Sequence, residues 1–213
     1  MKKFSVLNKY IPHGLLLTVI AVALALAFVV GLPHSALADK ILVPDVPDKL
    51  KPPEGAKVFL VGHAIGTQNY ICLPSGAGFA YSLFTPQATL FDDTHEQIIT
   101  HFFSVNPKNG IIRPTWQDSR DSSRVWAATV PDGAYTGSDF VEAGAIAWLL
   151  LKQDHTLDGP TGGDRLSETS FVQRLNTHGG SAPSTGCASL TDVGTRAFVP
   201  YTADYFFYRG GDN

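Results

Sequence analysis

The sequence predicts a mainly β protein, a single-domain antiparallel β-sandwich or barrel with little helix. From residue 57 onward, short apolar or alternating runs recur, and turn residues (Gly, Pro, Asn or Asp) end each of them. No segment longer than about ten residues combines a 3.6-residue period with capping residues, so we expect one or two helical turns at most. Many short strands with turns between them are typical of sandwiches and barrels.

The first 38 residues have the three parts of a secretory signal peptide. Three lysines and no acidic residue precede or flank an almost wholly apolar run at 15–30, Pro33 follows, and 36–38 is Ala-Leu-Ala. Small residues at these positions mark a cleavage site, so we expect cleavage after Ala38 and a secreted or periplasmic protein. The alternative is an uncleaved membrane anchor, because the run approaches the roughly 20 residues that span a bilayer.

Residues 39–56 predict an extended, Pro-rich N-terminal arm. Pro44, Pro47, Pro52 and Pro53 disfavour a helix and favour polyproline-like or turn structure. We expect the arm either to lie across the domain or to stay mobile.

Residues 57–213 form the predicted β-rich domain. The expected strands are 58–61, 68–73, 78–84, 88–91, 97–103, 124–130, 146–151, 168–175 and 198–208. Successive side chains of a strand point to opposite faces, so Gln68, Tyr70 and Cys72 should share one face. His63, in Gly-His-Ala-Ile-Gly, is expected in a loop between the first two strands.

Composition and missing motifs exclude several classes of function. The net charge is −3, all three N-terminal lysines fall in the predicted signal peptide, and the rest has no Lys/Arg cluster, which argues against nucleic-acid binding. There is no G-x-G-x-x-G after a strand, no phosphate-binding G-x-x-x-x-G-K-[ST], no H-E-x-x-H and no G-x-S-x-G. A nicotinamide-dependent dehydrogenase is therefore excluded, and we expect no cofactor and no metal.

Cys72 and Cys187 are the two cysteines of the chain. In the cytosol they would be two buried thiols, but after export a disulfide is the better interpretation. Their wide separation does not resemble a zinc ligand set or a redox C-x-x-C motif.

A few polar and aromatic residues are candidates for a site. His63 and His101 could each act as a base, because the pKa of histidine lies near neutrality, or could simply be hydrogen-bonded structural residues. Trp116, with Trp126 and Tyr135, could form an exposed surface on which sugar rings stack, although strand aromatics usually belong to the core.

The sequence resembles the family named domain of unknown function 3455, found in secreted bacterial and fungal proteins. The matching stretches are 59–72, 83–92, 97–104, 115–117, 119–121, 145–151, 172–177 and 199–208. They cover nearly all of the predicted domain in order. Some relatives carry a malate dehydrogenase label, which the missing nucleotide-binding motif argues against here.

The resemblance implies a set of residues but no activity. The positions that match its pattern, and are therefore the preferred ligand-binding candidates, are His63, Gln68, Tyr70, His101, Trp116 and Arg174. Both cysteine positions also belong to the pattern, which supports the disulfide.

Three functions follow as hypotheses. The first is a non-enzymatic binding domain for a glycan or another cell-envelope ligand, with a site made by aromatics near Trp116 and the loop around His63. The second is a hydrolase that uses His63 or His101 with a nearby aspartate. The third is a structural or surface-interaction protein without a small-molecule site. Membrane association is expected only if the N-terminal segment is uncleaved.

Overall fold

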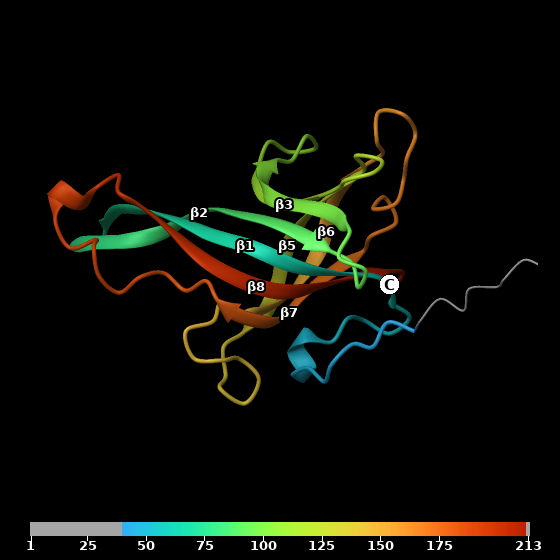
Figure 1. Cartoon of the computed structure of the whole chain (residues 1–213), viewed down its shortest axis with the longest axis horizontal. Helices are drawn as coiled ribbons and strands as arrows, with labels where there is room; N and C mark the ends of the chain where they lie inside the picture. Colours follow the sequence, from blue (N-terminus) through green and yellow to red (C-terminus); the bar gives the residue numbers. More distant parts are fainter. Residues whose placement is uncertain (1–39, 212–213) are drawn as a thin grey trace, which may run out of the picture. The chain divides into compact units, whose positions relative to one another are not determined.

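Eight antiparallel strands close into one barrel in the computed structural model, which describes residues 40–211 (Figure 1). The strands are β1 (Lys57–Ser75), β2 (Gly78–Phe91), β3 (Gln97–Val105), β4 (Ile112–Asp118), β5 (Arg124–Tyr135), β6 (Trp148–Leu157), β7 (Phe171–Gly179) and β8 (Arg196–Arg209). Each strand pairs with the next along the chain, and β8 returns to pair with β1. The mainly β prediction is confirmed, and the barrel is the correct alternative. The predicted signal peptide, 1–38, lies outside the described residues.

Side chains alternate between the interior and the exterior of the barrel. On β8, Tyr201, Ala203, Tyr205 and Phe207 are buried and belong to the cluster that fills the interior. This alternation is the two-residue period that a barrel wall imposes on every strand. On β1 the same period buries Gln68, Tyr70 and Cys72, the three residues predicted to share a face, while Ile65 is 62% exposed.

The loop predicted around His63 does not exist. β1 is one continuous strand that pairs with both β2 and β8 through this stretch, so His63 lies in the middle of a strand. The flanking glycines mark close packing instead: a Cβ on Gly66 would collide with the carbonyl oxygen of Gln87, and one on Gly62 would lie 2.9 Å from Leu90. Glycine inside a strand often marks such a close approach rather than a turn.

Two further predicted boundaries are wrong, and one strand was not predicted. Residues 78–91 form one strand, with a register shift opposite Asn69 and Tyr70 in place of the predicted break. β5 continues past Pro131-Asp132-Gly133 after an irregular stretch between Thr129 and Ala134. β4 is missing from the predicted strands, and it contains Pro114, a residue uncommon in the middle of a sheet.

A three-stranded extension continues from the barrel where β1, β2 and the start of β8 run beyond the other strands (Figure 1). The predicted disulfide is present here: Cys72 and Cys187 are bonded, with their Cα atoms 5.5 Å apart. It ties the segment between β7 and β8 to the extension. Tyr70 and Tyr81 add to this attachment by donating hydrogen bonds to the carbonyl oxygens of Gly180 and Gly186.

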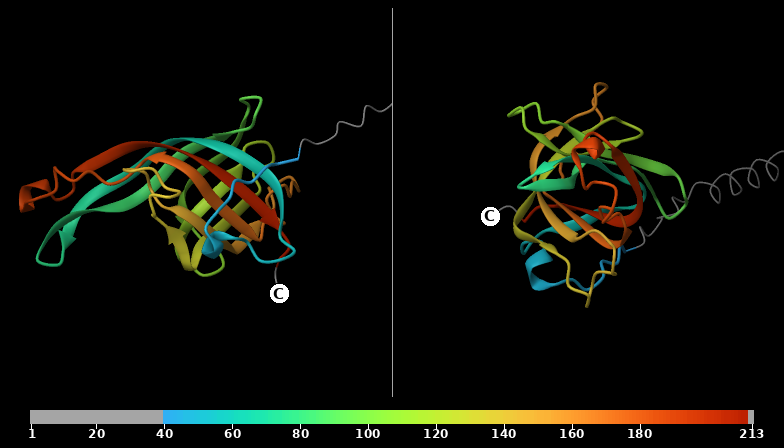
Figure 2. Two further views of the ribbon diagram at one scale, coloured as in Figure 1. Left: turned by 90° about the horizontal axis from the view of Figure 1, so that it is seen from below. Right: turned by 90° about the vertical axis from the view of Figure 1, so that its left-hand side faces the viewer.

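Residues 41–56 lie against the outside of the barrel wall (Figure 2). Leu50 is fully buried in a cluster with Phe171, Phe206 and other outward-facing residues of the strands. The side chain of Gln173 donates a hydrogen bond to the carbonyl oxygen of Leu50 at 2.6 Å. The segment contains one 3-10 turn, η1 (Asp48–Leu50), which begins directly after Pro47, and a turn closed by the hydrogen bond from the Ala56 N–H to the carbonyl oxygen of Pro53.

Helix is limited to η1 and a second 3-10 turn, η2 (Leu190–Asp192), within residues 40–211. In the same residues, no helix has the length and apolar character needed to cross a membrane.

Candidate functional site

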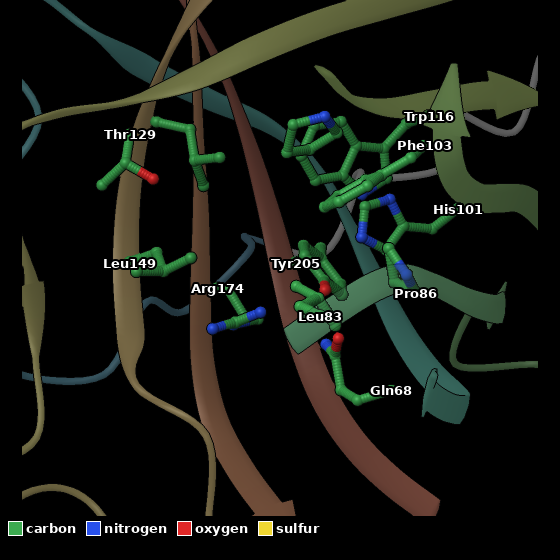
Figure 3. A pocket seen from close by; sticks show the side chains of 12 residues that line it. Gln68, Leu83, Pro86, His101, Phe103, Trp116, Thr129, Leu149, Arg174 and Tyr205 are labelled. Carbon is green, nitrogen blue, oxygen red and sulfur yellow. The ribbon is translucent and has the colours of Figure 1, made fainter. Parts of the chain in front are cut away.

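The barrel interior contains a cavity of about 190 Å³ near the base of the three-stranded extension (Figure 3). All eight strands contribute to its lining. Its apolar wall consists of Leu83, Pro86, Phe103, Pro114, Leu149 and Leu151. Its polar groups come from Gln68, His101, Trp116, Thr129, Arg174 and Tyr205. Four of the six preferred candidates, from β1, β3, β4 and β7, therefore meet in one cavity.

His101 and Trp116 form a parallel stack in the cavity wall. They are register partners on β3 and β4, and both point inward. Their ring centroids lie 4.4 Å apart with 9° between the ring planes. Tyr205 packs on both, at 5.1 Å from His101 and 5.6 Å from Trp116. The stack gives the cavity one rigid aromatic side.

His101 is a neutral acceptor. Its Nδ1 lies 2.9 Å from the carbonyl oxygen of Thr115, which can only accept, so Nδ1 carries the proton and Nε2 carries the lone pair. Burial, which disfavours the charged form, lowers the pKa of His101 to about 3. The imidazole is therefore uncharged over the whole physiological range of pH.

Arg174 supplies the positive charge of the cavity. Its Nε and Nη2 donate to the carbonyl oxygen of Ala147, at 3.1 and 2.8 Å, which fixes the direction of the guanidinium. Neither an aspartate nor a glutamate lines the cavity, and within residues 40–211 Arg174 forms no ion pair with a carboxylate. A partly buried cation without a counter-ion is costly, and a bound anion would compensate it.

Two buried polar atoms of lining residues lack a hydrogen-bond partner in the described part of the chain. They are Oε1 of Gln68 and Nε1 of Trp116, whose side chains are 2% and 1% exposed. Buried polar atoms in native proteins are nearly always satisfied, so each such exception needs an explanation. One atom is an acceptor and the other a donor, and a ligand or water in the cavity could satisfy both.

Tyr70 lies close by but serves another purpose. Its hydroxyl donates a hydrogen bond of 2.6 Å to the carbonyl oxygen of Gly180, and it does not line the cavity. Burial raises the pKa of Tyr70, so the hydroxyl remains a donor at neutral pH.

His63 lies on the outside of the barrel, away from the cavity. Its Nδ1 is 2.7 Å from Asp204 and its Nε2 is 2.9 Å from Asp93. Partial burial lowers the pKa of His63, but the two carboxylates outweigh this effect and hold the pKa above 6.5. An open hollow of about 530 Å³ beside it is lined by Ile65, Phe91 and other neighbours. The expected joint site of Trp116 and His63 is therefore wrong, because they lie on opposite faces of the barrel wall.

The core positions favoured for the strand aromatics are confirmed for two tryptophans, so these do not form an exposed surface for sugar stacking. Trp116 and Trp126 are 1% and 2% exposed, and they face opposite sides of the wall. The indole Nε1 of Trp126 donates to the hydroxyl of Ser104 at 2.8 Å, which is a structural role.

Several residues that line the cavity were not predicted from the sequence. Tyr205, Phe103 and Leu149 are lining residues that were not candidates. The alternation of apolar and polar residues along 201–205 indicates an inward face and could have pointed to Tyr205. Phe103 and Leu149 have no local signal, because only the register between neighbouring strands brings them to the cavity.

No cluster of three or more His, Cys, Asp or Glu side chains in residues 40–211 could hold a metal ion.

Comparison with known families gives one match. The family model described as "Protein of unknown function (DUF3455)" matches residues 52–209, which confirms the resemblance seen in the sequence. Searches of curated proteins and of solved structures found no match.

Proposed function

We propose that this chain, which belongs to the DUF3455 family of proteins of unknown function, is an exported, non-enzymatic protein that binds one small ligand in its barrel cavity. The observation that carries the proposal is the pair of unsatisfied atoms, Gln68 Oε1 and Trp116 Nε1, on residues that line the same cavity. A concave, largely apolar site with a few convergent polar groups is the usual form of a small-molecule site.

The size of the cavity restricts the ligand. Its volume is about 190 Å³, and an apolar cavity of about 150 Å³ is known to hold a benzene ring. One ring with a short polar substituent fits this space. A glycan or another cell-envelope component, the ligand class that the sequence suggested, would have to enter as a single ring-sized unit.

Export is part of the proposal. The disulfide between Cys72 and Cys187 supports it, because such bonds form and persist in oxidising compartments outside the cytosol. The predicted signal peptide would provide the route.

A hydrolase remains the second candidate, and one observation favours it: His63 lies within hydrogen-bond distance of Asp204 and of Asp93. A general base needs one nitrogen free for the proton that it removes. Here a carboxylate binds each nitrogen of His63, so the arrangement favours a charged imidazolium over a base. Loss of a hydrolytic activity in His63→Ala, with the fold intact, would support the hydrolase.

The binding proposal can be tested with a variant that blocks the cavity. Thr129 lines the cavity and is exposed, so Thr129→Phe should fill it without disturbing the core. Thr202→Phe is the matched control, because Thr202 is an exposed strand residue on the outside of the barrel.

The measurement is calorimetric titration with monosaccharides and singly substituted benzenes. We expect at least one compound to bind the wild type and Thr202→Phe equally, and to bind Thr129→Phe about tenfold or more weakly. Binding by none of the compounds, or equal binding by Thr129→Phe, would contradict the proposal and favour a structural or surface-interaction protein.

A further inference from the structure

We propose that the ligand of the barrel cavity is an organic anion, a small planar carboxylic acid whose carboxylate binds the guanidinium of Arg174. This inference rests on the proposed function and adds the chemical class of the ligand. It follows from the hydrogen bonds of Arg174, from the charge balance of the cavity and from the chemistry of the remaining wall.

The guanidinium of Arg174 has N–H donors without an acceptor among the described residues. An arginine side chain carries five N–H groups in a planar fork. The carbonyl oxygen of Ala147 binds the edge made by Nε and Nη2. The two N–H groups of Nη1 and the second one of Nη2 have no partner among the described residues. The edge made by Nη1 and Nη2 is the one that can bind both oxygens of a carboxylate.

The charge balance also favours an anion. Two other partly buried arginines, Arg113 and Arg165, pair with Asp154 and Asp118 at 3.0 and 3.2 Å. Arg174 has no such partner in the part of the chain that the structure describes, although half of the residues that line its cavity are apolar. A carboxylate in the cavity would provide the missing counter-ion where little water screens the attraction.

The field of Arg174 reaches the barrel interior. Burial raises the pKa of Tyr70 and of Tyr201 and lowers that of His101, and in all three the charge of Arg174 acts to lower the pKa. The charge of Arg174 therefore acts on His101 in the cavity wall and on two buried tyrosines that do not line the cavity. Among residues 40–211, no second cation lines the cavity, because His101 is neutral.

The rest of the wall suits a flat apolar body. Leu83, Phe103 and Leu149 provide apolar surface in the cavity wall, with Leu149 on the side of Arg174 and Phe103 on the side of Trp116 (Figure 3). Gln68 Oε1 and His101 Nε2 are acceptors, and Trp116 Nε1 is a donor, so a hydroxyl on the ring would also find partners. A dianion or a phosphate would bring more negative charge than the single guanidinium can compensate.

The experiment compares probes of one shape and different charge. Benzoate, benzamide and benzyl alcohol are titrated by calorimetry into wild-type protein, Arg174→Gln and Arg174→Lys. We expect the wild type to bind benzoate about tenfold or more tightly than benzamide, because the guanidinium forms an ion pair with the carboxylate but only a hydrogen bond with the uncharged amide. Arg174→Gln should remove this preference, so that it binds benzoate no more tightly than benzamide, and Arg174→Lys should retain part of it.

The outcomes separate this inference from the proposed function. If benzamide or benzyl alcohol binds the wild type as tightly as benzoate, the cavity binds ligands but the anion inference is wrong. If no probe and no other ring-sized compound binds, the proposed function itself fails.

If Arg174→Gln does not fold, the pH dependence of benzoate binding to the wild type is the test instead. The affinity for benzoate should stay constant above about pH 5 and fall near pH 4, where a carboxylate takes up a proton. An affinity for benzoate that does not change between these values would overturn the inference.

Discussion

The imidazole of His101 lies parallel to the indole of Trp116, with ring centroids 4.4 Å apart and 9° between the ring planes. The two residues are opposite each other on β3 and β4, and their stack forms one side of the cavity. The arrangement requires an uncharged imidazole, because an imidazolium here would be buried without a carboxylate partner. Protonation of His101 is thus coupled to the stability of the barrel.

The first prediction concerns stability at acidic pH. The pKa of His101 is about 3 in the folded protein against 6.5 in an unfolded chain, so between these values the unfolded state binds more protons. Stability should therefore rise with pH across this range, and the effect of His101 amounts to about 5 kcal/mol in total. It is fully present above pH 6.5 and lost as the pH falls towards 3.

His101→Asn is the variant that isolates this effect. An asparagine amide can still donate to the carbonyl oxygen of Thr115, but it does not titrate. The free energy of unfolding, measured with denaturant, should fall between pH 7 and pH 5 in both proteins. The fall should be smaller for His101→Asn than for the wild type, by roughly 2 kcal/mol. Equal losses for the two proteins would show that His101 is not buried as a neutral group.

The second prediction concerns the disulfide. Cys72 and Cys187 are 115 residues apart in the sequence, so their bond removes a large amount of conformational freedom from the unfolded chain. In the chain-entropy model, a loop of this length is worth about 4 to 5 kcal/mol. The double variant Cys72→Ala/Cys187→Ala should lose that much free energy of unfolding, measured with denaturant.

Reduced wild-type protein is the control for that variant, since it keeps both cysteine side chains. We expect the same loss as in the double variant. A loss below about 1 kcal/mol in both proteins would contradict the stabilising role of the bond. Mass spectrometry of unreduced exported protein should, in addition, detect a peptide that links the two cysteines.

The third prediction tests whether the N-terminal segment is part of the folded domain. Leu50 is fully buried against the barrel, whereas Leu42 in the same segment is 78% exposed. Leu50→Ala should lower the free energy of unfolding by about 2 to 4 kcal/mol, and Leu42→Ala by less than about 0.5 kcal/mol. Equal, small effects of the two substitutions would mean that the segment is not docked in solution.

The fourth prediction concerns His63. The carboxylates of Asp204 and Asp93 hold the pKa of His63 above 6.5. The charged form therefore adds stability that is fully present below pH 6.5 and is lost as the pH rises through the pKa of the folded state. Titration of the His63 ring by NMR should give a pKa above 6.5, and Asp204→Asn should lower it.

Asp93→Asn is the comparison for Asp204→Asn. The side chain of Asp93 is 84% exposed and that of Asp204 is 23% exposed, so water screens Asp93 more strongly. We expect the smaller decrease of the His63 pKa in Asp93→Asn. A wild-type pKa at or below 6.5 would contradict the paired geometry.

The strand pattern made the fold class predictable, but the boundaries depended on packing. Gly62 and Gly66 suggested a loop because glycine is common in turns, whereas here each glycine fits a tight place in a continuous strand. β4 was not predicted, although it is a strand that contains Pro114. Proline has no N–H group, and the sequence does not show at which positions of a strand that donor is not needed. Closure of the barrel depends on pairing between β1 and β8, the two strands farthest apart in the sequence.

The cavity was predictable only in part. Gln68, His101, Trp116 and Arg174 emerged from the family pattern, and they do line one cavity. Their convergence was not predictable, because it depends on the register of all eight strands around the barrel. His63 failed as a partner of Trp116 because inward and outward positions alternate along β1, and His63 has an outward one.

The binding of a small ligand beside Trp116 is tested most directly by NMR of the indole N–H groups. The protein has three tryptophans, of which Trp116 lines the cavity, while Trp126 and Trp148 do not. Titration with a ring-sized ligand such as benzoate should shift the Nε1–H signal of Trp116 in a saturable way and leave the other two in place. If the Trp116 signal stays unchanged at saturating ligand, or all three signals move together, the cavity is not the binding site.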